Sequence, residues 1–213
     1  METQFMEDKA TQYAYISIHN FFGNLTFSSM QHTIDGVLEA ATSEKIWKKR
    51  SAAHLLFFME NLNMLVEAAF VIYYDHSERE NVILDLPEDG YPDLSVKEQF
   101  QDRNFFSNEW NNFPRNLTES QYHNPYKGIK KFCKYMAEPE WKKAIKDCTA
   151  YALGPDNIQE IFPSYNLLLF RRRVLQLIEA CHLIEIRSNK KNANTIINEE
   201  IDNSEEANEK NEI

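Results

Sequence analysis

The chain has 213 residues, a formal net charge of −10 at pH 7 and only 5 glycines. Hairpin turns and phosphate-binding loops need glycine, so the low count argues against hairpin-rich sandwiches and barrels and against glycine-rich nucleotide loops. The acidic balance argues against a generic nucleic-acid binder, because such proteins usually carry excess positive charge.

The negative charge is confined to two segments. Residues 75–93 carry seven acids against one arginine, and residues 189–213 carry seven acids against three lysines. These segments account for the whole net charge, so the rest of the chain is balanced. Local basic faces therefore keep an anionic partner compatible with the sequence.

In the first half of the chain, capping residues and apolar spacing predict helices. Ser28 and Gln31 have the spacing of a capping box, and Ser43 is a second candidate cap. Helices are expected over residues 28–41, 43–74 and 95–106, with a long acidic loop over 75–94.

The second half begins with an irregular stretch, residues 107–124, which Pro114 interrupts. Asn124-Pro125 is a typical helix start, because asparagine caps well and proline is tolerated in the first turn. Helices are expected from Pro125 to about Met136, from Pro139 to about Leu153, and over 164–188.

The expected fold is all-α: a helical bundle built on two long apolar helices, 45–74 and 164–188, with shorter helices and the acidic loop. Residues 1–188 are predicted to form a single helical domain. Residues 189–213, rich in Asn and Glu and without an aromatic, are predicted to be a disordered acidic tail.

Three scattered cysteines without a C-x-x-C motif favour a reducing compartment, and no signal peptide is visible. A cytoplasmic location is therefore expected. The most apolar stretch, 52–74, contains Glu60, Asn61, Asn63 and Glu67, and buried polar groups of this kind are costly in lipid. No membrane span is predicted.

Four polar residues on the long helices are candidates for a ligand or metal site: Glu60, Glu67, Glu179 and His182. Glu179 and His182 have the Glu-x-x-His spacing of di-iron bundles, but such sites need two of these pairs. The favoured alternative is that these glutamates form ion pairs with Arg171–Arg173 or Lys49. No cofactor is predicted.

Candidate anion-binding residues share one face of the helix after Asn124. They are Lys127, Lys130, Lys131 and Lys134, interleaved with aromatic residues. Lys142, Lys143 and Lys146 continue the charge, and Lys45, Lys48, Lys49 and Arg50 form a second cluster. The favoured alternative for the first face is a solvated surface with Phe132, Cys133 and Met136 turned inward.

An apolar helix that opens with Lys49-Arg50-Ser51-Ala52-Ala53 resembles HEPN-type helical proteins, many of which are ribonucleases. Their signature is an Arg, usually followed by a polar residue, and a His after four to six residues. Here Arg115-Asn116 precedes His123 with seven residues between, which departs from that spacing. The resemblance implies that Arg115, Asn116 and His123 would carry RNA cleavage, with His123 as the general base.

No complete catalytic motif is present, so no catalytic residue is predicted and a non-enzymatic protein is favoured over an enzyme. The leading prediction is a helical protein-interaction or regulatory protein that binds a protein partner or a second copy of itself. The alternatives are a nucleic-acid-binding or HEPN-like ribonuclease protein, with nucleic acid not favoured, and a bundle with a carboxylate/His metal or small-ligand site.

Overall fold

The computed structural model describes residues 2–23, 26–43, 46–78, 114–156, 158 and 167–187, with side chains omitted at 2–8 and 76–78. All regular secondary structure in these ranges is helical, which confirms the all-α prediction. The helix expected over 95–106, most of the acidic loop and the tail over 189–213 lie outside the described residues. The single-domain organisation of residues 1–188 stays a prediction.

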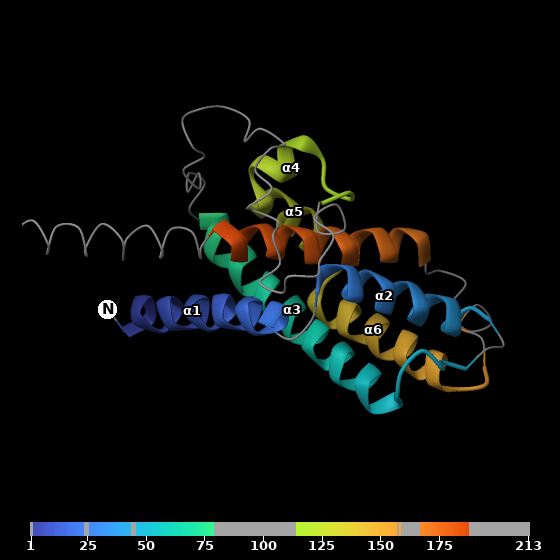
Figure 1. The fold of residues 1–213 in the computed structure, drawn as a ribbon. Coiled ribbons are helices and arrows are strands. Elements are labelled where there is room, and N and C mark those ends of the chain that lie inside the picture. The colour runs from blue at the N-terminus through green and yellow to red at the C-terminus, as the bar shows by residue number, and fades with distance from the viewer. Residues whose placement is uncertain are drawn as a thin grey trace, which may run out of the picture.

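The helices are α1 (Glu2–Gly23), α2 (Phe27–Ala41), α3 (Ala52–Glu78), α4 (Glu119–His123), α5 (Pro125–Cys133) and α6 (Glu138–Leu153). A further helix occupies residues 167–187 and is the unlabelled orange helix of Figure 1. α1 and α4 were not predicted. α4 lies in the stretch expected to be irregular, and Thr118 and Gln121 form a capping box at its start.

Two predicted helix starts are wrong. α2 is capped by Thr26, whose side chain accepts the Ser29 backbone N–H at 3.2 Å, rather than by Ser28 with Gln31. α3 begins at Ala52 rather than at residue 43, with the Ser51 hydroxyl accepting the His54 N–H at 3.3 Å. Residues 46–51 consequently form a non-helical linker, which we call the α2–α3 linker, so Lys49 is not part of α3.

The helix over 167–187 lies in the middle of the molecule, with α4 and α5 on one side and α2 and α6 on the other (Figure 1). α3 crosses obliquely and packs against α1, α5 and α6. Trp141 joins three of these elements, because its ring stacks on Phe132 at 4.0 Å between centroids and lies 5.5 Å from the ring of Phe170. This aromatic cluster fixes α5 and α6 against the 167–187 helix.

Within the described residues, one helix is both long and apolar. By length and composition alone, the stretch Ala52–Asp75 of α3 is able to cross a membrane, and 56% of its apolar window is buried in the fold. Buried core helices of soluble proteins have the same length and composition, so the absence of a membrane span stays a prediction. Only one of the two long apolar helices expected is thus confirmed.

Candidate functional site

Glu179 is the most deeply buried acid described in the structure, with no exposed surface. Its carboxylate accepts the backbone N–H groups of Arg115, Asn116 and Leu117 at 2.9, 2.7 and 3.0 Å, and the Asn116 side-chain amide at 2.7 Å. Burial raises the pKa of Glu179, while these four donors oppose the rise. The acid expected in a ligand site therefore holds the chain before α4 in place.

Two further side chains of the 167–187 helix bind the same region. Gln176 is buried, and its amide donates to the Asn116 carbonyl at 2.7 Å. Arg187 donates to the carbonyls of Tyr122 and His123 at 2.8 and 3.3 Å and lies over the Tyr122 ring. Polar residues along this helix thus serve as backbone anchors.

His182 lies between two aromatic rings from other helices. Its ring is stacked on Phe27 at 5.3 Å between centroids and lies 5.1 Å from Phe22. Burial lowers its pKa to about 4, and its Nδ1 is buried without a hydrogen-bond partner among the described residues. The two members of the Glu-x-x-His pair therefore have separate structural roles: Glu179 binds backbone N–H groups, and His182 packs between aromatic rings.

Glu60 and Glu67 lie on the exposed side of α3. Glu67 pairs with Lys142 at 2.6 Å, and Lys142 also pairs with Glu138 at 2.7 Å. The structure thus does not gather the four candidates Glu60, Glu67, Glu179 and His182 around one cavity. No cluster of three or more potential metal ligands occurs in the described part of the chain.

The ion pairs expected for these glutamates also have different partners. Arg171 pairs with Asp35 of α2, with Nη2 2.9 Å from Oδ2. Arg173 donates to the Gln176 side chain and lies over the Tyr135 ring, and Lys49 pairs loosely with Glu39 at 3.5 Å. Arg171 therefore binds across to α2, and Arg173 contacts Gln176 of its own helix and Tyr135 just after α5, rather than Glu60, Glu67 or Glu179.

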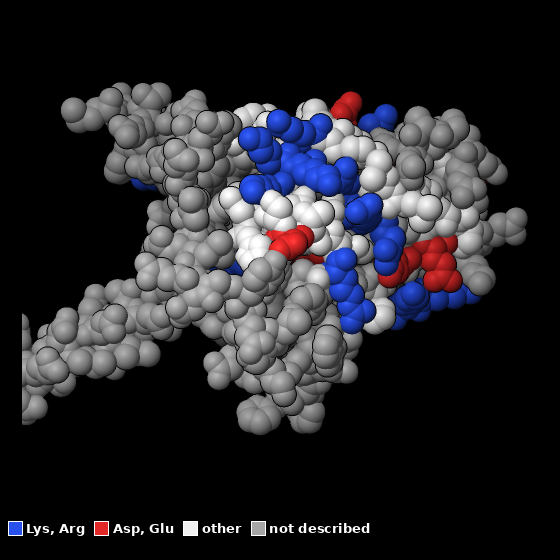
Figure 2. Space-filling model, turned by 90° about the horizontal axis from the view of Figure 1, so that it is seen from above, with Lys and Arg blue, Asp and Glu red and all other residues white. Residues whose placement is uncertain are grey.

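Four lysines form an exposed surface on α5, which we call the α5 lysine face: Lys127, Lys130, Lys131 and Lys134. Within the described residues none of them pairs with a carboxylate, and Lys127 donates to the Ser120 hydroxyl at 2.9 Å. On the opposite side of α5, Phe132 and Cys133 are buried, and Met136 just beyond it is half-buried. Figure 2 shows that Lys and Arg outnumber Asp and Glu on this side of the molecule.

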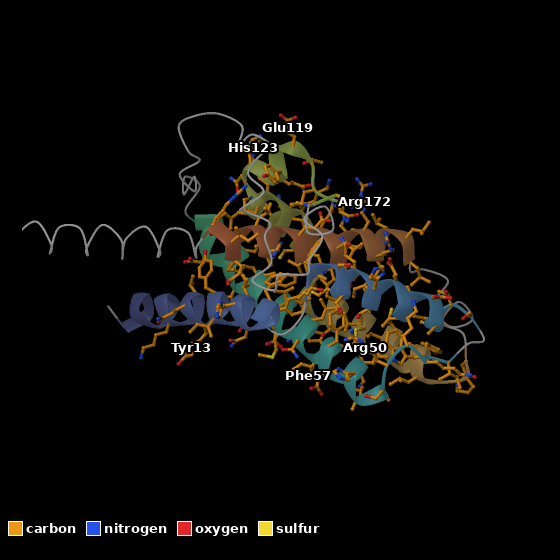
Figure 3. All side chains as sticks on the ribbon, viewed as in Figure 1. Tyr13, Arg50, Phe57, Glu119, His123 and Arg172 are labelled. Atoms are coloured by element: carbon orange, nitrogen blue, oxygen red, sulfur yellow. The ribbon has the colours of Figure 1, made fainter. Side chains whose placement is uncertain are left out.

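The three residues of the ribonuclease alternative lie around α4. Asn116 is held by Glu179 through both backbone and side chain, whereas Arg115 is exposed. His123 ends α4, is half-buried and lies edge-on to Tyr122 (Figure 3). Glu179 holds residues 115–117 firmly in place. The Asn116 side chain is used in this contact, whereas a ribonuclease site would need to present it to the RNA.

Large apolar side chains are exposed on α1 and α3. Tyr13 is 67% exposed, Phe57 51% and Met64 47%, and Ile16, Leu56 and Tyr74 are exposed as well. Tyr13 and Phe57 both point away from the 167–187 helix, on the same side of the molecule (Figure 3). Sequence reasoning missed the α1 residues because it did not predict α1, although the spacing of Ala14, Ile18 and Phe21 was a helical signal.

No family model, curated protein or solved structure matches the chain.

Proposed function

We propose that the protein is a non-enzymatic helical interaction protein that pairs with a second copy of itself through the outer faces of α1 and α3. The observation that carries the proposal is the exposure of large apolar side chains on these two adjacent helices. Apolar surface grouped in this way commonly marks a protein interface. The free, buried cysteines are consistent with a cytoplasmic location.

The positions of these side chains suit helix pairing. Phe57 and Met64 are seven residues apart on α3, and Tyr13 and Ile16 are three apart on α1, so each pair lies on one helix face. In a two-fold dimer both faces would be buried together, because an isologous interface uses the same patch twice. In this proposal α3 and the 167–187 helix form the spine of a bundle within one domain over residues 1–188.

The test is the oligomeric state of the purified chain, measured by sedimentation equilibrium over a range of concentrations. We expect a dimer that the double variant Ile16→Glu/Met64→Glu converts to a folded monomer. The control is Leu168→Glu, since Leu168 is 81% exposed but lies on a different helix, and it should remain dimeric. A wild-type monomer at every concentration, or a dimer that the double variant leaves intact, would contradict the proposal.

The α5 lysine face favours a second candidate, the binding of single-stranded RNA. Four exposed lysines without a carboxylate partner in the described part of the chain leave positive charge that RNA phosphates can neutralise. We expect salt-dependent RNA binding that the triple variant Lys130→Glu/Lys131→Glu/Lys134→Glu abolishes and that Lys9→Glu, an exposed site on α1, preserves.

The absence of binding at low salt would rule out this second candidate. The same assay tests the ribonuclease alternative, in which the bound RNA would be cut and His123→Ala would stop the cutting. Intact RNA after prolonged incubation with the wild-type protein would contradict that alternative.

A further inference from the structure

The α2–α3 linker folds back against α2 and forms one wall of a cavity. The Trp47 backbone N–H donates to the Ala152 carbonyl at 2.8 Å, which ties the linker to the end of α6. The Trp47 ring packs on Gly36, where a Cβ would lie only 2.8 Å from Cζ3 of the ring. Glycine at this position therefore permits the close approach that places the rest of the linker beside the start of α2.

A cavity of about 320 Å³ lies between the linker and the first turns of α2. Lys49 and Arg50 line it from the linker, and α2 contributes hydroxyl groups from Ser28, Ser29 and Thr33. Arg50 lies 3.4 Å from the Ser29 hydroxyl and has no carboxylate partner among the described residues. The lining includes no acidic side chain, and the carboxylate nearest to its cations among the described residues is that of Glu39, 3.5 Å from Lys49 and itself 60% exposed, so the lining is positively charged.

Unused hydrogen-bond donors border the same cavity. The Thr26 side chain accepts the N–H of Ser29, so the N–H groups of Phe27 and Ser28 have no acceptor within the helix. A helix start, two cations and hydroxyl groups together match the needs of a phosphate group.

An apolar cavity of about 170 Å³ adjoins the first and shares Thr33, Trp47 and Arg50 with it. Its other walls are His54, Leu55, Phe57 and Phe58, from the first turns of α3. Arg50 and Phe57 are neighbours in Figure 3. A planar ring can lie against the exposed Phe57 side chain while a phosphate joined to it reaches Arg50.

We propose that these two joined cavities bind a mononucleotide, with the phosphate held by Lys49, Arg50 and the start of α2 and the base packed against Phe57. The site uses no glycine-rich loop, which agrees with the low glycine content. It also lies apart from the α5 lysine face, since α5 and α2 lie on opposite sides of the 167–187 helix (Figure 1). Phe57 is shared with the proposed dimer face of α3, so a dimer that buries this side chain would compete with the base, whereas Lys49 and Arg50 lie outside the apolar faces of α1 and α3.

The test is calorimetric titration of the full chain with AMP, ribose 5-phosphate, inorganic phosphate and adenosine. We expect AMP to bind most tightly, because it alone fills both cavities. Loss of the base or of the phosphate should each weaken binding by about tenfold or more. No binding of AMP at millimolar concentration would overturn the proposal, and equal binding of AMP and ribose 5-phosphate would overturn the placement of the base.

Variants locate the site. Arg50→Gln should weaken AMP binding by about tenfold or more, whereas Arg172→Gln, an exposed arginine on the other side of the molecule, should leave it unchanged. Phe57→Ala should weaken AMP binding but not phosphate binding. AMP binding that survives Arg50→Gln in full, or that falls equally in the two arginine variants, would overturn the proposal.

Discussion

The carboxylate of Glu179 accepts the backbone N–H of Asn116 at 2.7 Å, across 63 positions of sequence. The Asn116 side-chain amide and the N–H groups of Arg115 and Leu117 complete four hydrogen bonds to the same acid. An irregular segment thereby obtains the hydrogen bonds that a helix or sheet would otherwise supply. Glu179 is best understood as part of the fold rather than as a reactive group.

Replacement of Glu179 by alanine should strongly destabilise the protein. The substitution leaves several donors unsatisfied in a buried place, so we expect the free energy of unfolding to fall by about 3 kcal/mol or more. The measurement is urea unfolding followed by circular dichroism. Glu60→Ala, at an exposed position on α3, is the matched control and should change stability by less than about 0.5 kcal/mol.

His182 should make stability depend on pH. Burial lowers its folded-state pKa to about 4, below the 6.5 that is usual for histidine, so the unfolded chain binds more protons between these two pH values. The contribution of the neutral ring is complete above pH 6.5 and is lost as the pH falls to 4, by up to about 3 kcal/mol. The free energy of unfolding, measured from pH 4 to 6.5, should depend less steeply on pH in His182→Leu than in the wild type. Parallel pH dependences of the two proteins would show that His182 is not the titrating group.

Gly36→Ala should disturb the α2–α3 linker. The added Cβ would meet Trp47 at 2.8 Å and the Lys49 Cδ at 2.9 Å, so we expect a loss of about 1–3 kcal/mol. Gly23→Ala is the control, because a Cβ there meets nothing within 4 Å. Thermal unfolding of the two variants should separate them clearly, and equal stability would argue against the tight packing of Trp47.

The hydroxyl pair Tyr15–Tyr126 should help to hold α1 on the body of the protein. The two oxygens lie 2.8 Å apart, and burial raises the pKa of both groups, so both stay protonated at neutral pH. Tyr15→Phe should cost about 1 kcal/mol and speed amide exchange in α1. Tyr13→Phe, at a side chain that is 67% exposed, should do neither.

The three cysteines should be unreactive in the folded protein. All are free and buried, and burial raises the pKa of Cys133 and Cys148 to about 12 and that of Cys181 as well. We expect a thiol reagent at pH 8 to label none of them in the native state and all three in denaturant. One rapidly labelled thiol under native conditions would show that a helix opens locally.

Sequence reasoning succeeded where the signal was local. Asn124 caps α5 by accepting the Tyr126 N–H at 3.1 Å, and Gly154 ends α6, both as expected. α1 lacks such markers, and its sequence signal was limited to the helical spacing of buried residues such as Ile18 and Phe21, which pack beside α3. Its existence depends on tertiary packing, which a single sequence does not display.

The candidate site illustrates the same limit. The spacing of Glu179 and His182 predicts that both lie on one side of a helix, but their surroundings come from distant segments. Glu179 meets residues 115–117, and His182 meets Phe22 and Phe27 from the beginning of the chain. Helical periodicity predicts that the lysines of the α5 lysine face are exposed. That they have no carboxylate partner within the described residues could be seen only in the three-dimensional structure.

Arg187 is the final described residue of its helix, and its guanidinium binds the final carbonyls of α4. One helix thus supplies the C-terminal cap of another. A chain shortened to end at residue 186 would leave those carbonyls without their donor, whereas one ending at 187 would keep it. The smallest fragment that keeps α4 capped is therefore set by one side chain, that of Arg187.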